Sequence, residues 1–337
     1  MPQARFFTSA IIIATAFISS SPTLAAGKYH FWSAPKNVSM CETGSTVVAL
    51  PLNPRAVGGH ESMGVKFVTA VGRNLSRAIR SKSYNLPAFK AEFVSAARSG
   101  AYAKLGPKGR TGGSPVFVSS AILTSAAHVV SLLDQRKAWT LEERKIVINW
   151  GNRIDKNQNH KYQYATLDSL AAIAAARMSW GAATNQTKIF NKGMRDFQKL
   201  MKRISKNGLF EKNMRDNNEI FGPILIAAEA AMNSGKNVYG KKYGKFTLHD
   251  AVRIHADKTL AAGAKKIAVA EDEARSYFRP SGFAAHVAWI PIYLSRYPNT
   301  AAAKSVRNLK SAVSKVKRGR FHGNTVAGPS ECLWGKA

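Results

Sequence analysis

Polar and titratable side chains gather in one short segment, Asn159-His160-Lys161-Tyr162-Gln163-Tyr164. Its amide, imidazole, ammonium and two phenols supply hydrogen-bond donors and groups that can act as general acid or base. Residues 165–176, which follow, carry Asp168 as their only charged side chain. Polar groups beside a buried element need partners once they leave water, so the segment is a candidate functional site. The structural alternative makes Asn159 a helix N-cap and His160 a hydrogen-bonded core histidine.

A helix over residues 159–178 is expected to position these side chains. It is apolar almost all round, which is typical of a helix buried on every side. Tyr164 lies four residues after His160, so the two side chains share one face of such a helix. The candidate site therefore lies at the mouth of a buried helix.

Two kinds of helix alternate along the rest of the chain. Helices that are apolar all round are expected at residues 114–133, 159–178 and 283–294, and amphipathic helices at 65–81, 140–154 and 186–204. An inner and an outer ring of helices produce such an alternation. The fold class expected is all-α, an incomplete (α/α) toroid of about ten helices with an irregular N-terminal arm.

Residues 1–26 are typical of a signal peptide, with Arg5 before a short apolar stretch and small residues before Ala26. Residues 27–337 are then expected to form one domain, periplasmic or secreted, without stable membrane insertion. In an oxidising compartment Cys41 and Cys332 are expected to form a disulfide. Two free buried thiols are the alternative.

The charge of the chain indicates a polyanionic partner. Lys and Arg number 50 against 19 Asp and Glu, which gives a formal net charge of +31. An acidic polysaccharide, nucleic acid and an anionic membrane surface all fit, and export disfavours nucleic acid. The eight histidines show no ligand spacing, so neither a metal nor a cofactor is expected.

The segment Gln158-Asn159-His160-Lys161-Tyr162 resembles the Asn-Asn-His-Ser-Tyr-Trp motif of the poly(mannuronate)-type alginate lyases. The order of later segments is also similar: Asn207-Gly208-Leu209-Phe210-Glu211, then residues 222–228 and 288–293. The resemblance covers roughly residues 65–300. It implies an (α/α) toroid that cleaves an acidic, uronate-containing polysaccharide by β-elimination, as a monomer without a cofactor.

The chain departs from the family pattern at the residues that are expected to carry out catalysis. Gln158 and Gln163 replace an Asn and a Trp of the motif. The family's Tyr-His-Asn-Tyr segment, which includes its catalytic tyrosine, is replaced by the shorter Arg215-Asp216-Asn217-Asn218-Glu219. The catalytic apparatus is therefore rearranged or lost.

Elimination requires neutralising the C6 carboxylate, removing the C5 proton and protonating the O4 leaving group. By resemblance, Asn159 and His160 lie against the carboxylate, and His160 can act as base for one C5 epimer. Arg215 takes the role of the family's arginine. Tyr164 or Tyr162 is the first candidate for the missing phenol, and Tyr277 the next.

Further residues are candidates for substrate binding. Lys104, Lys108 and Arg110 lie in a glycine-rich loop over residues 102–113, which could close over neighbouring carboxylates or be an ordinary solvated loop. Other candidates are Tyr277 and Arg279, in an irregular stretch, and Trp289, which could stack on a pyranose ring or belong to the core.

Three functions remain open on the sequence. The first is an exported polysaccharide lyase acting on an acidic polysaccharide. The second is a non-catalytic acidic-polysaccharide-binding protein on the same fold, which the missing tyrosine favours. The third is an exported cationic protein that binds membranes or nucleic acid through charge alone.

Overall fold

The computed structural model describes residues 29–35, 38–52, 63–106, 115–158, 166–204, 206–211, 214–265, 286–316, 322–323 and 328–335. Helices dominate these ranges: α1 (Met63–Arg80), α2 (Leu86–Ser99), α3 (Pro115–Gln135), α4 (Leu141–Gln158), α5 (Leu167–Ala183), α6 (Thr187–Met201), α7 (Met214–Asn233), α8 (Leu248–Lys265), α11 (Ile290–Arg296), α12 (Ala301–Val316) and α13 (Ser330–Trp334). The all-α class is confirmed.

Strands are limited, in the described part of the chain, to two short antiparallel pairs. β1 (Lys242–Tyr243) pairs with β2 (Phe246–Thr247), so that Lys242 lies opposite Thr247. β3 (His322–Gly323) pairs with β4 (Gly328–Pro329) beside α13.

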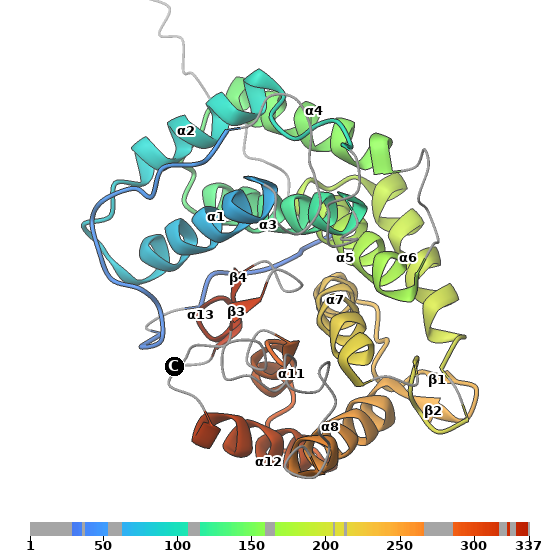
Figure 1. Cartoon of the computed structure of the whole chain (residues 1–337). Helices are drawn as coiled ribbons and strands as arrows, with labels where there is room; N and C mark the ends of the chain where they lie inside the picture. Colours follow the sequence, from blue (N-terminus) through green and yellow to red (C-terminus); the bar gives the residue numbers. More distant parts are fainter. Residues whose placement is uncertain are drawn as a thin grey trace, which may run out of the picture.

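The helices form two layers along an arc, as Figure 1 shows. α1, α3, α5, α7 and α11 lie on the inside, and neighbours in this inner row contact one another. α2, α4, α6, α8 and α12 lie on the outside, where α2 contacts α4 and α8 contacts α12. This arrangement is the incomplete (α/α) toroid that the alternation of helix types predicts.

Burial follows the sequence patterns. α3 and α5 are buried around most of their circumference, whereas α1 and α6 bury one face and expose their basic residues. By length and composition α3 could cross a membrane, but here it is a fully enclosed core helix of the toroid. Its apolar surface packs against the neighbouring helices α1, α4 and α5.

Two helix boundaries differ from expectation. The helix expected over residues 159–178 is described only from Leu167, after the extended N-cap Thr166, so α5 does not include the Asn159–His160 segment. The helix expected from residue 283 has turns at 287–289, and α11 begins at Ile290 because Pro291 fits only the first turn of a helix.

The irregular N-terminal arm is held to the helices by side chains. Asn74 of α1 accepts a hydrogen bond from Val48 N at 2.8 Å and donates to Val48 O at 2.7 Å, as a neighbouring strand would. The arm is linked covalently to α13 by the Cys41–Cys332 disulfide, across 291 residues of sequence. The predicted disulfide is confirmed, and the alternative of two free thiols is wrong.

A buried ion triad joins α4, α5 and α6. Arg177 of α5 is 1% exposed and donates from Nε to Asp155 Oδ1 of α4 at 2.8 Å. It also donates from Nη1 to Asp196 Oδ2 of α6 at 2.6 Å. Both carboxylates are buried as well; the guanidinium is hydrogen-bonded to each of them, and Lys192 of α6 adds a second positive charge that interacts with both.

Arg177→Met is expected to lower the free energy of unfolding by about 3–5 kcal/mol, because two buried carboxylates lose the cation that is hydrogen-bonded to both. Arg253→Met is the matched control, since it breaks the exposed Arg253–Asp257 pair of α8 (3.8 Å). Its expected cost is at most about 0.5 kcal/mol. Chemical denaturation of both variants measures the difference, and equal losses would show that the triad does not join the three helices.

His128 is a buried core histidine of α3. Its ring packs edge-on against Phe31, Trp32 and Trp334, and its Nδ1 lies 3.0 Å from Thr124 O. Burial lowers the pKa of His128 from its ordinary value of 6.5 to about 4. The imidazole is therefore neutral in the folded protein at neutral pH.

The pH dependence of stability follows from this lowered pKa. Protonation of His128 favours the unfolded chain, so its contribution is complete above pH 6.5 and is lost as the pH falls through about 4. His128→Gln, which cannot be protonated, is expected to flatten the decline of unfolding free energy over this window. Urea denaturation at a series of pH values compares the two slopes, and parallel curves would contradict this assignment.

Candidate functional site

The Asn159–His160 segment connects α4 to α5. Residues 159–165 lie outside the described residues, so Asn159, His160, Tyr162 and Tyr164 are not placed. The residues on either side of the segment are placed. Gln158, at the end of α4, is fully buried and donates to Ser119 Oγ at 3.1 Å and Ser120 Oγ at 3.2 Å on α3.

Thr166 marks the other end of the segment, at the N-terminus of α5. As N-cap it makes no side-chain hydrogen bond to a backbone N–H of the helix, and its Oγ1 donates instead to Ser169 Oγ at 3.0 Å. The first backbone N–H groups of a helix point out of its N-terminus and carry partial positive charge. This end of α5 is therefore suited electrostatically to an anion.

A hollow of about 650 Å³ opens beside the N-terminus of α5. We call it the basic hollow; it is lined by Thr166, Leu167, Leu170, Lys199, Lys202, Arg203 and Glu211. Its three cations come from the end of α6 and the residues just after it, and all three are exposed. With one carboxylate against three cations, the hollow attracts anions.

α6 positions these cations through its amphipathic pattern. Its apolar face buries Phe190, Phe197 and Leu200 in the core. Lys199 and Lys202 then lie on the solvent side of the last turn, at the end of the helix where the macrodipole favours positive charge. The same pattern that buries α6 thus turns its basic residues toward the hollow.

Glu211 is held at the hollow by backbone contacts of its connection. Asn217 of α7 accepts from Phe210 N at 2.9 Å and Glu211 N at 3.2 Å, and donates to Glu211 O at 2.6 Å. Gly208 has φ +79°, and a Cβ there would lie 2.5 Å from Ile254 Cδ1. The left-handed conformation at this turn therefore favours glycine, whereas the close contact is with the flexible end of the Ile254 side chain, which can shift.

Arg215 lies in the first turn of α7, close in sequence to this connection. Its backbone is described, but its side chain lies outside the described part of the structure. The next turn of α7 is anchored by Asn218, whose Oδ1 is 2.9 Å from His255 Nε2 and accepts from Trp289 Nε1 at 2.9 Å. The start of α7 is thus fixed against α8 and the turn before α11.

The position of Trp289 differs from expectation. Its indole is 0% exposed and packs near Phe221 and His255. It therefore has no ring face available to a sugar, contrary to the expected stacking, because Asn218 draws its N–H into the core. Burial also lowers the pKa of His255 to about 3, so this imidazole is a neutral structural group.

The other candidates for substrate binding divide between described and undescribed residues. Lys104 is exposed, at the start of the basic loop. Lys108, Arg110, Tyr277 and Arg279 lie outside the described residues.

Several polar residues of these regions were not singled out in the sequence. The cations Lys199, Lys202 and Arg203 are one such group; their clustering at the end of a predicted helix was the available signal. A second is Glu219 of α7, whose Oε1 lies 3.7 Å from His286 Nδ1, with both side chains largely buried. Glu219 is the last residue of the 215–219 stretch, His286 lies just before the turn that leads to α11, and carboxylate–imidazole pairs can transfer protons.

No group of three or more His, Cys, Asp or Glu side chains that could hold a metal ion occurs among the residues that were placed. The described residues of the basic hollow offer three cations, one carboxylate and a helix N-terminus. Cations and a helix N-terminus bind a carboxylate and stabilise negative charge that develops on it.

Comparison with known proteins gives structural matches only. No protein-family model and no curated protein matches the sequence. The crystal structure of alginate lyase A1-III from Sphingomonas species A1 matches with a TM-score of 0.61 at 14% identity, over 90% of this chain and 86% of that chain.

Two variants of alginate lyase A1-III, one with His replaced by Ala and one with Tyr replaced by Phe, are each complexed with a tetrasaccharide. Each matches with a TM-score of 0.60 at 16% identity, over the same shares of the two chains. At such identity the similarity concerns the fold. This chain therefore has a divergent alginate lyase-like fold.

Proposed function

We propose that the protein is an exported polysaccharide lyase, a single domain over residues 27–337, that cleaves an acidic, uronate-containing polysaccharide by β-elimination. The observation that carries this proposal is the basic hollow, because Thr166, the residue that follows the Asn159–His160 segment in the chain, lines it. The alginate lyase-like fold and the net charge of +31 support it. The Cys41–Cys332 disulfide supports an oxidising compartment, periplasmic or extracellular.

The first task of the site is to neutralise the C6 carboxylate of the uronate. The C5 proton is weakly acidic until this charge is compensated, because the intermediate resembles an enolate dianion. Asn159, His160 and Arg215 are the proposed donors to this carboxylate. The N-terminus of α5 adds a favourable dipole at the same place.

The second task is proton transfer at C5 and at O4. His160 is the proposed base for one C5 epimer, and the phenol of Tyr164 or Tyr162, or else Tyr277, is the proposed partner. Positioned acid–base groups of this kind accelerate a reaction by about 10²–10⁴-fold. No cofactor is required for this elimination.

The sugars on either side of the cleaved bond carry their own carboxylates. Lys199, Lys202 and Arg203 line the basic hollow and are suited to bind one of them. Lys104, Lys108 and Arg110 are proposed to bind further units, together with Tyr277 and Arg279. The protein then acts as a monomer on a polymer that extends past both ends of the site.

A second candidate function is binding of acidic polysaccharide without cleavage. The absence from the sequence of the family's Tyr-His-Asn-Tyr segment favours it. Both functions use the basic hollow, so binding of the polysaccharide does not distinguish them. Formation of a cleaved product does.

The lyase reaction predicts an unsaturated uronate at the new non-reducing end of each product. Mannuronan, guluronan, glucuronan and mixed exopolysaccharides are incubated with the protein, and the ultraviolet absorbance of the unsaturated product is followed. At least one polymer is expected to give product, and His160→Ala to reduce the rate by about 10²-fold or more. Binding without product from every polymer favours the second candidate function.

Reversing one charge of the basic hollow tests the binding step. Lys202→Glu is expected to weaken binding of uronate oligomers by about tenfold or more, through lost attraction and new repulsion. Lys258→Glu, on the exposed face of α8, makes the same change of net charge away from the hollow. Calorimetric titration at two salt concentrations compares them, and equal weakening would show that only total charge matters.

A further inference from the structure

The solvent face of α6 carries one continuous row of basic side chains. Its members are Lys188, Lys192, Arg195, Lys199 and Lys202, which follow one another at intervals of three or four residues and so lie on one side of the helix. We call them the α6 row. Lys192 is half-buried and the other four are exposed. At a helical rise of about 1.5 Å per residue, the row is about 20 Å long.

No carboxylate of α6 lies on this face. Asp196 is the only acidic residue of the helix, and its side chain is buried and bound to Arg177 in the ion triad. Neither Lys188 nor Arg195 forms a salt bridge within the part of the chain that the structure describes. The exposed charge of the α6 row is therefore directed to solvent.

The helix itself gains no stability from this arrangement. Like charges three or four residues apart on a helix repel one another, and every step along the row is such a pair. Lys188 also lies in the first turn, where the macrodipole disfavours a cation. This turn has no acidic residue, and the N-cap Gln186 makes no side-chain cap hydrogen bond. A surface of one sign that costs stability is typical of a surface that binds the opposite charge.

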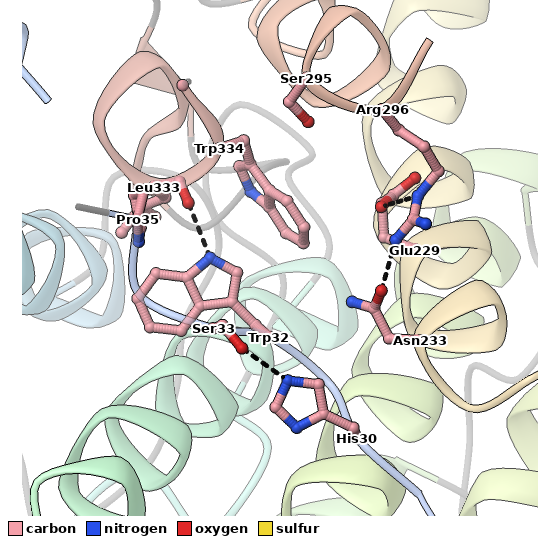
Figure 2. A pocket seen from close by; sticks show the side chains of 11 residues that line it. His30, Trp32, Ser33, Pro35, Glu229, Asn233, Ser295, Arg296, Leu333 and Trp334 are labelled. Carbon is pink, nitrogen blue, oxygen red and sulfur yellow. Dashed lines mark hydrogen bonds and ion pairs between the residues drawn. The ribbon is translucent and has the colours of Figure 1, made fainter. Parts of the chain in front are cut away.

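A cation at another hollow shows a different arrangement. Near the C-terminal end of α7, a hollow of about 400 Å³ is lined by Trp32, Trp334 and Arg296, among others. There Arg296 donates from Nε to Glu229 Oε2 at 2.6 Å, as Figure 2 shows. The charge of Arg296 is thus compensated within its own chain, whereas the exposed cations of the α6 row face solvent.

The α6 row leads into the basic hollow. Lys199 and Lys202 line the hollow, and Arg195, Lys192 and Lys188 continue from it along the helix. A linear polymer seated in the hollow can therefore extend over the row. Successive cations are about 5 Å apart along the helix axis, which is close to the length of one sugar unit in a polyuronate. Each such unit carries one carboxylate, so the two charge patterns are complementary.

We propose that the α6 row binds the part of a linear acidic polysaccharide that extends beyond the basic hollow, with one carboxylate per sugar unit facing the cations. This inference rests on the proposed function for the class of polymer, but it requires binding and not cleavage.

Two other polyanionic partners fit the row less well. Duplex DNA carries a charge about every 1.7 Å of its axis, a much closer spacing than that of the cations. A membrane surface is bound by helices that expose an apolar face beside their cations. The apolar face of α6 is buried in the core and has nothing to insert into lipid.

Neutralising the end of the row that lies away from the hollow tests this assignment. Mannuronan, guluronan and glucuronan are titrated calorimetrically, each as a trisaccharide and as a long chain. The double variant Lys188→Gln with Arg195→Gln is expected to weaken binding of at least one long chain about tenfold or more and to leave trisaccharide binding unchanged. Lys258→Gln with Lys304→Gln, on the exposed faces of α8 and α12, removes the same charge elsewhere and should retain the affinity of the unmodified protein.

Urea denaturation verifies the fold of the double variant, whose midpoint should be equal or higher because repulsion within α6 is reduced. Duplex DNA and vesicles of anionic phospholipid are titrated in parallel. The proposal is overturned if no long chain binds more tightly than its trisaccharide, or if the control variant weakens long-chain binding equally. It is also overturned if the double variant weakens DNA or vesicle binding more than polysaccharide binding.

Product formation separates this inference from the proposed function. A long chain that binds through Lys188 and Arg195 but is not cleaved supports the α6 row and contradicts the lyase reaction. A long chain that is cleaved, and that the double variant and the unmodified protein bind with the same affinity, supports the lyase reaction and contradicts the α6 row.

Discussion

The guanidinium of Arg177 is the interaction on which the geometry of this protein most depends. It is enclosed by α4, α5 and α6 and holds one carboxylate from each of the other two helices. α4 ends at Gln158, directly before the Asn159–His160 segment, and the caps Thr166 of α5 and Lys202 of α6 line the basic hollow. A buried charge tolerates little displacement of its partners, so the triad fixes the ends of three helices relative to one another. The buried, paired ions of the triad thus hold the helices whose exposed ends form the charged basic hollow.

Two different electrostatic environments coexist at the ends of the same inner helices. At one end, Lys199, Lys202 and Arg203 line the hollow beside the start of α5, together with Glu211. At the other, the guanidinium of Arg296 is matched by Glu229 and walled by indoles. The difference arises from burial: Lys199, Lys202 and Arg203 are exposed to solvent, whereas the carboxylate of Glu229 is 3% exposed and needs a cation from its own chain. The same inner row of helices thus has exposed cations near one end and an internally paired, buried carboxylate near the other.

The sequence predicts the features that local pattern determines. Spacing of apolar residues identifies α1, α3 and α6, and the two cysteines of an exported chain predict their own pairing. Features set by tertiary contacts were missed. The start of α5 at Leu167 follows no strong local signal. The basic hollow lies between α6 and the connection at Phe210 and Glu211, and Asn217 of α7 holds that connection in place. Trp289 was misjudged for the same reason, since its partner Asn218 lies 71 residues away.

The disulfide has a consequence for the order in which the molecule can be assembled. Cys332 is synthesised 291 positions after Cys41, and every helix described from α1 to α12 lies between the two cysteines in the chain. The bond can therefore form only after all of these helices have been synthesised. Once formed, it limits how far the N-terminal arm and α13 can separate in the unfolded chain. The disulfide forms only when the chain brings the two thiols together, so its formation reports that the N-terminal arm and α13 are in contact.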